Sequence, residues 1–169
     1  GSNRFTAYDR LGKTRCGIVQ DKLSKIKLLA LDVDGVLTDG TINICDNGEL
    51  FKGFNAKDGL GISCALRSGL KVAIITGRKS EIIHKRSAEL GITLLCEGVK
   101  DKYAELIKLT KELTLTKEEV AYMGDDLNDL SAFRAAAFPT NSIFLWRSSP
   151  RIGFQMPSQL KVWTENIQI

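Results

Sequence analysis

Short apolar runs that end abruptly in polar clusters constrain the fold of this chain more than any other feature of its sequence. Four such runs, at 26–31, 70–75, 93–96 and 120–123, are typical of buried strands. Segments with apolar residues at helical spacing separate them, at 59–67, 80–90 and 101–113. Strands covered on both faces are short and almost wholly apolar, and strands that alternate with helices form parallel sheets. We therefore predict an α/β fold, a doubly wound parallel sheet with helices on both faces.

The segment 41–54 breaks this rhythm. Two runs suited to strands flank the turn Asp46-Asn47-Gly48, and Asn-Gly between such runs predicts a β-hairpin. Because the hairpin follows the first strand directly, it would project over the carboxyl ends of the strands, where open α/β sheets bind ligands. Its apolar residues would be partly exposed in a monomer, which favours a subunit contact. They are Ile42, Ile44, Leu50 and Phe51.

Three polar clusters, at 32–39, 76–79 and 124–129, each begin where an apolar run ends. Strand ends of a parallel sheet lie along one edge, so the clusters can face one crevice. Gly35 indicates that the chain turns there and spreads the carboxylates of Asp32 and Asp34 apart. Oxygen ligands without His or Cys select a hard cation, and Mg²⁺ fits best because it retains waters and phosphate oxygens.

This set of side chains suits phosphoryl transfer. A carboxylate beside Mg²⁺ can attack phosphorus, and a second carboxyl group can protonate the leaving group and then activate water. Thr76 and a lysine such as Lys102 would bind the phosphoryl oxygens. Structural readings stay open: turn chemistry for the aspartates, a strand end for Thr76, the start of a helix for Lys102 and a solvated turn for Arg78.

In their order along the chain, the four motifs resemble those of haloacid dehalogenase (HAD) superfamily phosphatases. They are Asp-x-Asp-Gly-Val, a strand-terminal Thr-Gly-Arg, a downstream lysine and Gly-Asp-Asp-x-x-Asp. The resemblance covers residues 26–138 and is specific as a set, although each motif alone is weak. It implies a Rossmann-like fold and a Mg²⁺ cofactor.

Carried over by position, the resemblance assigns a role to each site residue. Asp32 corresponds to the nucleophile and a metal ligand, and Asp34 to the general acid/base, with its backbone carbonyl on the metal. Asp125 corresponds to the direct metal ligand, with Asp126 and Asp129 as its neighbours in the motif. Thr76 and Lys102 correspond to the phosphate-binding residues.

About 40 residues separate the first two motifs, so a hairpin flap replaces a cap domain. Together with Phe54-Asn55-x-Lys57-Asp58-Gly59, this resembles the 3-deoxy-D-manno-octulosonate (KDO) 8-phosphate phosphatases of lipopolysaccharide precursor biosynthesis. That family implies a homotetramer in which a neighbouring subunit helps close each active site, and a small anionic sugar-phosphate substrate. Gly77, Arg78 and Arg86 are further candidates for binding it, and the Arg78 guanidinium could hold a carboxylate in a bidentate pair.

Three alternatives stay open at this point. Relatives that act on nine-carbon sugar acid 9-phosphates share most of the pattern. A non-catalytic oligomerisation module related to sugar-nucleotide synthetases is a second, and a phosphoacceptor receiver domain is a third. A panel of eight- and nine-carbon sugar acid phosphates tests the first, and a phosphatase assay with Mg²⁺ separates the second from an enzyme. Labelling by acetyl phosphate with slow loss would favour the third.

Composition narrows the partners and the location. A net charge of +4 with scattered Lys and Arg gives no basic stripe for nucleic acid. No apolar run approaches a membrane span or a signal core, and the cysteines form no disulfide pattern, which favours the cytoplasm. We expect an N-terminal arm at 1–25, a catalytic core at 26–140 and an atypical segment at 141–169, either an altered reading frame or a divergent folded end, without the family's glycine-rich tail.

Overall fold

The computed structural model describes residues 23–141. Five strands form one sheet in the order β5-β4-β1-β6-β7, and every neighbouring pair is parallel. The strands are β1 (Leu28–Leu31), β4 (Lys71–Ile75), β5 (Leu94–Cys96), β6 (Val120–Gly124) and β7 (Phe138–Asn141). From β1 the chain builds outward through β4 to β5, and it then adds β6 and β7 on the other side of β1. The sheet is therefore doubly wound, as predicted.

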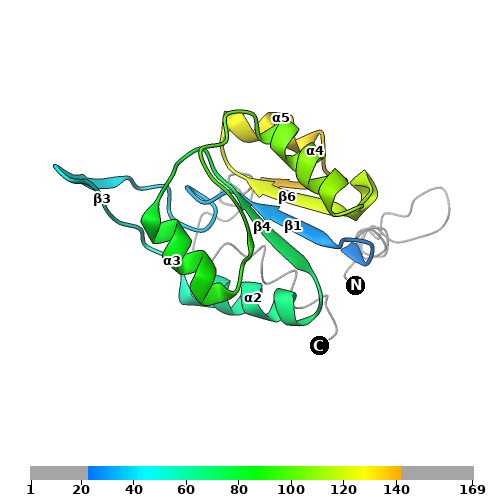
Figure 1. The fold of residues 1–169 in the computed structure, drawn as a ribbon, viewed down its shortest axis with the longest axis horizontal. Coiled ribbons are helices and arrows are strands. Elements are labelled where there is room, and N and C mark those ends of the chain that lie inside the picture. Colours follow the sequence, from blue (N-terminus) through cyan, green and yellow to red (C-terminus); the bar gives the residue numbers. More distant parts are fainter. Residues whose placement is uncertain (1–22, 142–169) are drawn as a thin grey trace, which may run out of the picture.

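Helices cover both faces of this sheet (Figure 1). On one face lie α2 (Ala56–Arg67) and α3 (Glu81–Leu90), and on the other lie α4 (Lys102–Glu112) and the short α5 (Leu130–Phe133). The central strand β1 alternates between two apolar cores. Leu29 and Leu31 pack on the side of α2 and α3, whereas Leu28 and Ala30 pack on the side of α4. Burial on both faces explains why β1 reads as an unbroken apolar run.

Side-chain caps fix the starts of these helices. Ser80 caps α3 by accepting a hydrogen bond from the backbone N–H of Ile83, and serine is among the residues that favour this position. Asn55 does the same for α2 through Lys57 N–H, so α2 begins at Ala56, three residues before the predicted start at Gly59. Thr116 and Glu119 form a capping box on the 3₁₀ helix η1 (Lys117–Glu119).

Strand β7 was not predicted, because it contains Pro139. Proline has no N–H to donate, so its presence argues against a central strand but is tolerated at a sheet edge. Among residues 23–141, β7 is the outermost strand of the sheet, and its neighbour is β6.

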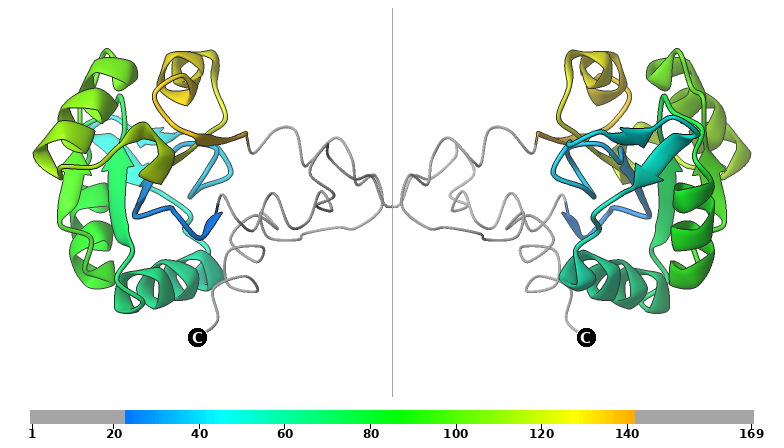
Figure 2. Two further views of the ribbon diagram at one scale, coloured as in Figure 1. Left: turned by 90° about the vertical axis from the view of Figure 1, so that its right-hand side faces the viewer. Right: turned by 90° about the vertical axis from the view of Figure 1, so that its left-hand side faces the viewer.

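The predicted hairpin is present as β2 (Asn43–Cys45) and β3 (Gly48–Phe51), which pair antiparallel. It projects away from the body of the molecule on the side where β1 ends (Figure 1), and it points toward the viewer in the right-hand view of Figure 2. Gly48 has φ +116 in the turn, a conformation that glycine adopts without strain. Within 23–141 this hairpin is all that stands in place of a cap domain.

The predicted arm at 1–25 and the segment at 141–169 lie outside the described residues, apart from 23–25 and 141. Across the described residues, no helix has the length and apolar character that crossing a membrane requires.

Candidate active site

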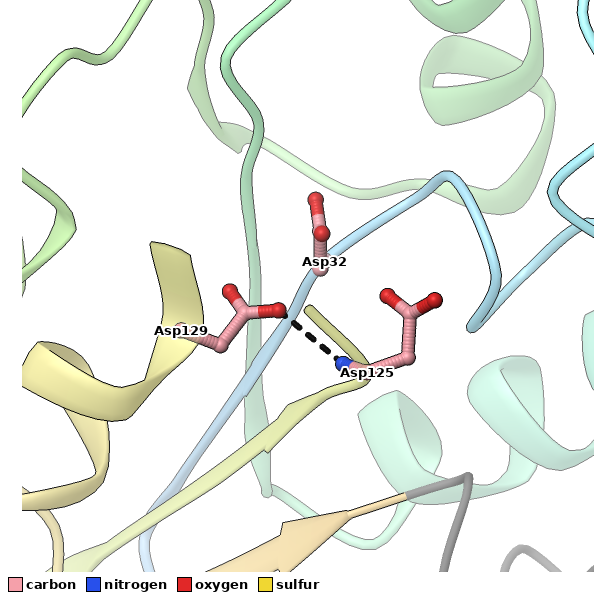
Figure 3. A group of neighbouring side chains, drawn as sticks. All are labelled: Asp32, Asp125 and Asp129. Carbon is pink, nitrogen blue, oxygen red and sulfur yellow. Dashed lines mark hydrogen bonds between the residues drawn. The ribbon is translucent and has the colours of Figure 1, made fainter. Parts of the chain in front are cut away.

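Three carboxyl groups meet at the carboxyl ends of β1 and β6. Asp32 follows β1 directly, Asp125 follows β6, and Asp129 ends the 3₁₀ helix η2 (Leu127–Asp129). One oxygen from each lies within 4.8 Å of the others, and Figure 3 shows the three side chains gathered around one point. The sheet topology causes this meeting, because β1 and β6 are parallel neighbours whose ends coincide.

Lys102, the first residue of α4, places its ammonium group between two of these carboxylates. Its Nζ lies 2.8 Å from Asp32 Oδ2 and 2.7 Å from Asp129 Oδ1. All three side chains are buried. Burial would lower the pKa of Lys102, but its hydrogen bonds to Asp129 and Asp32 raise it above the ordinary value. Lys102 therefore stays charged in this site.

Asp129 is completely buried and holds the site together. Besides Lys102, its carboxylate accepts hydrogen bonds from the Tyr122 hydroxyl (2.6 Å) and from the backbone N–H groups of Asp125 (2.9 Å) and Asp126 (3.0 Å). Burial would raise its pKa, but these donors lower it overall. Sequence reasoning placed Asp129 beside Asp125 in the motif without a role of its own, although the spacing of four residues across a helical turn is the signal that brings the two together.

Asp125 is the least satisfied carboxyl group of the cluster. Its Oδ1 is buried without a hydrogen-bond partner among the described residues. Burial, with repulsion from Asp32 and Asp129, raises its pKa to about 6. An unpartnered carboxylate oxygen within reach of two more carboxylates is what a bound hard cation would relieve. The site therefore fits a divalent cation with oxygen ligands.

Asp32 itself accepts a hydrogen bond from its neighbour's backbone, Val33 N–H, at 2.7 Å. Burial raises the pKa of its carboxyl group, against the lowering effect of Lys102. Asp34 has different partners: its carboxylate lies 2.5 Å from Lys52 Nζ and 3.4 Å from Arg78 Nε. The two aspartates thus diverge, as the turn at Gly35 predicted. The side chain of Asp34 lies outside the cluster of three, and its predicted metal contact is through the backbone.

Sequence reasoning missed Lys52. It lies just after β3 at the base of the hairpin, and 4% of its side chain is exposed. Burial would lower its pKa, but hydrogen bonds to Asp34 and Glu49 raise it. Its position in the sequence, in a polar and apolar mixture typical of an exposed hairpin, gives no signal of this burial.

Thr76 is buried at the end of β4. Its backbone N–H donates to Cys96 O (2.9 Å), its carbonyl accepts from Val99 N–H (3.0 Å), and its hydroxyl accepts from Arg78 N–H (3.4 Å). Gly77 follows in an exposed position. The structure thus places Thr76, Gly77 and Arg78 on the same edge of the sheet as Asp32.

Arg86 occupies a separate place on α3. Its guanidinium pairs with Glu89 (2.8 Å) and lies 5.7 Å from the centre of the Phe54 ring. It closes one side of an open groove of about 750 Å³ between α2, α3 and the base of the hairpin. Lys52 also lines this groove, so the groove adjoins Asp34. His84 is exposed on α3 and pairs with Glu97.

Comparisons with known proteins agree with this geometry. No protein-family model matches the sequence. The chain is 51% identical over 111 residues to 3-deoxy-D-manno-octulosonate 8-phosphate phosphatase KdsC of Escherichia coli (strain B / BL21-DE3), covering 66% of this chain and 59% of that protein. It is also similar to the solved structure of the Moraxella catarrhalis phosphatase of that name, with 44% identity and a TM-score of 0.69 over 72% of this chain and 70% of the other. The chain belongs to the 3-deoxy-D-manno-octulosonate 8-phosphate phosphatase family of the HAD superfamily.

Other structures of the KDO 8-phosphate phosphatase family extend the likeness. The cobalt-bound enzyme from Haemophilus influenzae is 33% identical with a TM-score of 0.71, and the match covers 88% of this chain and 96% of that one. The M. catarrhalis structure contains a magnesium ion, a phosphate ion and a KDO molecule. This chain spans 59% of the length of the E. coli family member.

Proposed function

We propose that this chain is a Mg²⁺-dependent phosphatase that hydrolyses KDO 8-phosphate to KDO and inorganic phosphate, a step of lipopolysaccharide precursor biosynthesis. The observation that carries the proposal is the meeting of Asp32, Asp125 and Asp129 around one point, with Lys102 at its edge. The names of the similar proteins support the substrate. The catalytic unit would be residues 26–140.

The proposed metal ligands are the side chains of Asp32 and Asp125 and the backbone carbonyl of Asp34. The unpartnered Oδ1 of Asp125 supports this set. When bound, Mg²⁺ would supply positive charge that offsets the repulsion among carboxylates and phosphoryl oxygens. Asp129 would act mainly by holding Lys102 and the backbone of Asp125, since its oxygens are already engaged.

In the proposed mechanism, a carboxylate oxygen of Asp32 attacks phosphorus and forms an aspartyl phosphate as the ester P–O bond breaks. Asp34 gives its proton to the leaving sugar oxygen. The Asp34 carboxylate then takes a proton from a water molecule that attacks the same phosphorus. This second displacement breaks the bond to Asp32 and releases inorganic phosphate, with both aspartates restored.

The remaining residues would bind the substrate. Thr76, Gly77 and Lys102 would donate to the phosphoryl oxygens, whose charge needs fixed donors in the transition state. Arg78, with its side chain 49% exposed beside Asp34, could hold the sugar-acid carboxylate. Arg86 lines the adjoining groove and would contact the far end of the sugar.

Phosphate release from KDO 8-phosphate by purified protein tests the proposal, with and without Mg²⁺. We expect release that requires Mg²⁺, and its loss in Asp32→Asn, which keeps the shape of the side chain but not the nucleophile. Glu118→Gln, on the exposed 3₁₀ helix η1 that precedes β6, is the matched control and should keep full activity. Wild-type rates higher on nine-carbon than on eight-carbon sugar acid phosphates would refute the substrate, and normal turnover by Asp32→Asn would refute the mechanism.

We also propose that the chain forms a homotetramer through contacts of the hairpin. We propose the cytoplasm as its location. Four apolar side chains of the hairpin are more than half exposed, at 52%, 70%, 57% and 53% for Ile42, Ile44, Leu50 and Phe51. An apolar surface of this kind suits a subunit contact. Free thiols at Cys45, Cys64 and Cys96 support a reducing compartment.

A further inference from the structure

The base of the hairpin carries a buried lysine that joins it to the general acid/base. Lys52 Nζ lies 2.5 Å from Asp34 Oδ1 and 2.9 Å from Glu49 Oε1. Only 4% of the Lys52 side chain is exposed. Lysine is rarely buried unless its charge is paired, and removal of one partner from such a pair is costly. The contact therefore fixes both the lysine and the carboxylate that it meets.

A second contact joins β3 to the start of α3. Glu49, on β3, accepts a hydrogen bond from the hydroxyl of Ser80, the residue that caps α3. Ser80 is itself held, because its backbone N–H donates to Glu97 at 3.0 Å. Through Glu49 and Lys52, the hairpin is thus tied to the loop that carries Asp34 and to the start of α3.

We propose that Lys52 is a positioning residue for Asp34, which orients the general acid/base carboxylate only while the hairpin is seated against the site. The hairpin then docks against the site and the Asp34 carboxyl group becomes aligned at the same time. Arg78, whose Nε lies 3.4 Å from the other oxygen of Asp34, is half exposed and holds the carboxylate less firmly. This inference rests on the proposed function, because it assigns Asp34 the acid/base role.

The leaving group distinguishes this role from a purely structural one. A sugar alkoxide must receive a proton to leave, whereas p-nitrophenolate is a weak base and leaves without one. Loss of aligned acid catalysis should therefore slow an alkyl phosphate much more than p-nitrophenyl phosphate. We expect Lys52→Met to lower kcat about 10- to 100-fold on KDO 8-phosphate, because misalignment removes only part of the roughly 10²–10⁴-fold contribution of general acid catalysis, and to lower it less than about 3-fold on p-nitrophenyl phosphate.

A conservative replacement and a control variant accompany this measurement. Lys52→Arg can still meet both carboxylates and should restore most of the alkyl phosphate rate. Lys71→Met removes an exposed lysine at the start of β4, the end of the strand opposite to the site, and should match wild type on both substrates. Equal losses on both substrates in Lys52→Met would overturn the proposal.

Hydrogen–deuterium exchange gives a readout that needs no turnover. Exchange at residues 43–51 should rise in Lys52→Met and in Asp34→Asn, because each variant releases the hairpin, and should stay at the wild-type level in Lys71→Met. Unchanged exchange in Lys52→Met would also overturn the proposal. If the wild type hydrolyses neither substrate, the proposed function fails, and the exchange data still decide whether Lys52 ties the hairpin to Asp34.

Discussion

Gly35 packs against the carboxyl group of Asp125 so closely that a Cβ atom at Gly35 would lie 1.8 Å from Asp125 Oδ2. Gly35 also has φ +84, which side-chain-bearing residues rarely adopt. The turn that follows Asp34 therefore leaves room for the Asp125 carboxyl group only because residue 35 has no side chain. One residue serves two purposes here: it turns the chain and it admits the carboxylate.

Gly35→Ala should displace the Asp125 carboxylate, because the added methyl group occupies its place. We expect weaker Mg²⁺ binding by titration calorimetry and a fall of about 100-fold or more in kcat, since displacements of about 1 Å carry costs of this size. Gly69→Ala is the matched control: Gly69 has φ +89 with no atom within 4 Å of the Cβ position. It should carry similar backbone strain, of order 1 kcal/mol, and normal activity. An equal loss of activity in both variants would attribute the effect to backbone strain alone.

The ammonium group of Lys102 forms ion pairs with both Asp32 and Asp129, so the three charges depend on one another. Lys102→Met leaves two buried carboxylates without their ammonium partner, and we expect the free energy of unfolding to fall by about 3–5 kcal/mol. Adding Asp129→Asn removes one of the stranded charges. The double variant should therefore lose at least about 1 kcal/mol less than the sum of the single losses. Urea unfolding without Mg²⁺ measures all three variants, and strictly additive losses would contradict the coupling.

The exposed apolar side chains of the hairpin lead to a prediction about how the subunits assemble. If its exposed apolar side chains form the subunit contact, Ile44→Glu places a charge in that contact and should reduce the particle mass in light scattering from a tetramer toward a monomer. Tyr103→Glu, on the 42% exposed Tyr103 of α4, is the control and should leave the mass unchanged. A monomeric wild type, or a tetramer that tolerates Ile44→Glu, would argue against assembly through the hairpin.

The sheet could be predicted from the sequence because strands buried on both faces are uniformly apolar. Val72, Ala73 and Ile74 each enter one of the two cores, so the run shows no polar interruption. The edge strand β7 lacks this uniform apolar character, and Pro139 makes β7 still harder to recognise as a strand. Sequence patterns thus describe the centre of this sheet well and its edge poorly.

The residues of the site also divide into those that the sequence predicts and those that it does not. Asp32 and Asp125 follow strands, so topology alone brings them together. Lys52 and the groove beside Arg86 depend on where the hairpin folds back, which is set by tertiary contacts such as the one between Glu49 and Ser80. No local spacing encodes a contact across 31 residues of sequence, and this is why Lys52 was missed.

A last prediction concerns Asp58, a buried acid of α2 that the proposed chemistry does not use. Only 4% of Asp58 is exposed, and its Oδ1 has no hydrogen-bond partner among the described residues. Burial raises its pKa from 3.8 to about 6, although Arg86 acts to lower it. Because the folded state binds this proton more tightly than the unfolded state, Asp58 favours folding below about pH 4, and this contribution is lost as the pH rises through about 6.

Asp58→Asn should therefore stabilise the protein above pH 6, by an amount on the order of 2–3 kcal/mol, and change little at pH 4. Urea unfolding between pH 4 and pH 8 measures this difference. Ser87→Ala supplies the control, because the Ser87 hydroxyl is also buried and without a partner among the described residues but does not titrate in this range. It should shift stability by the same amount at every pH. A curve for Asp58→Asn that runs parallel to the wild type would show that Asp58 titrates normally, and that Arg86 compensates its burial in full.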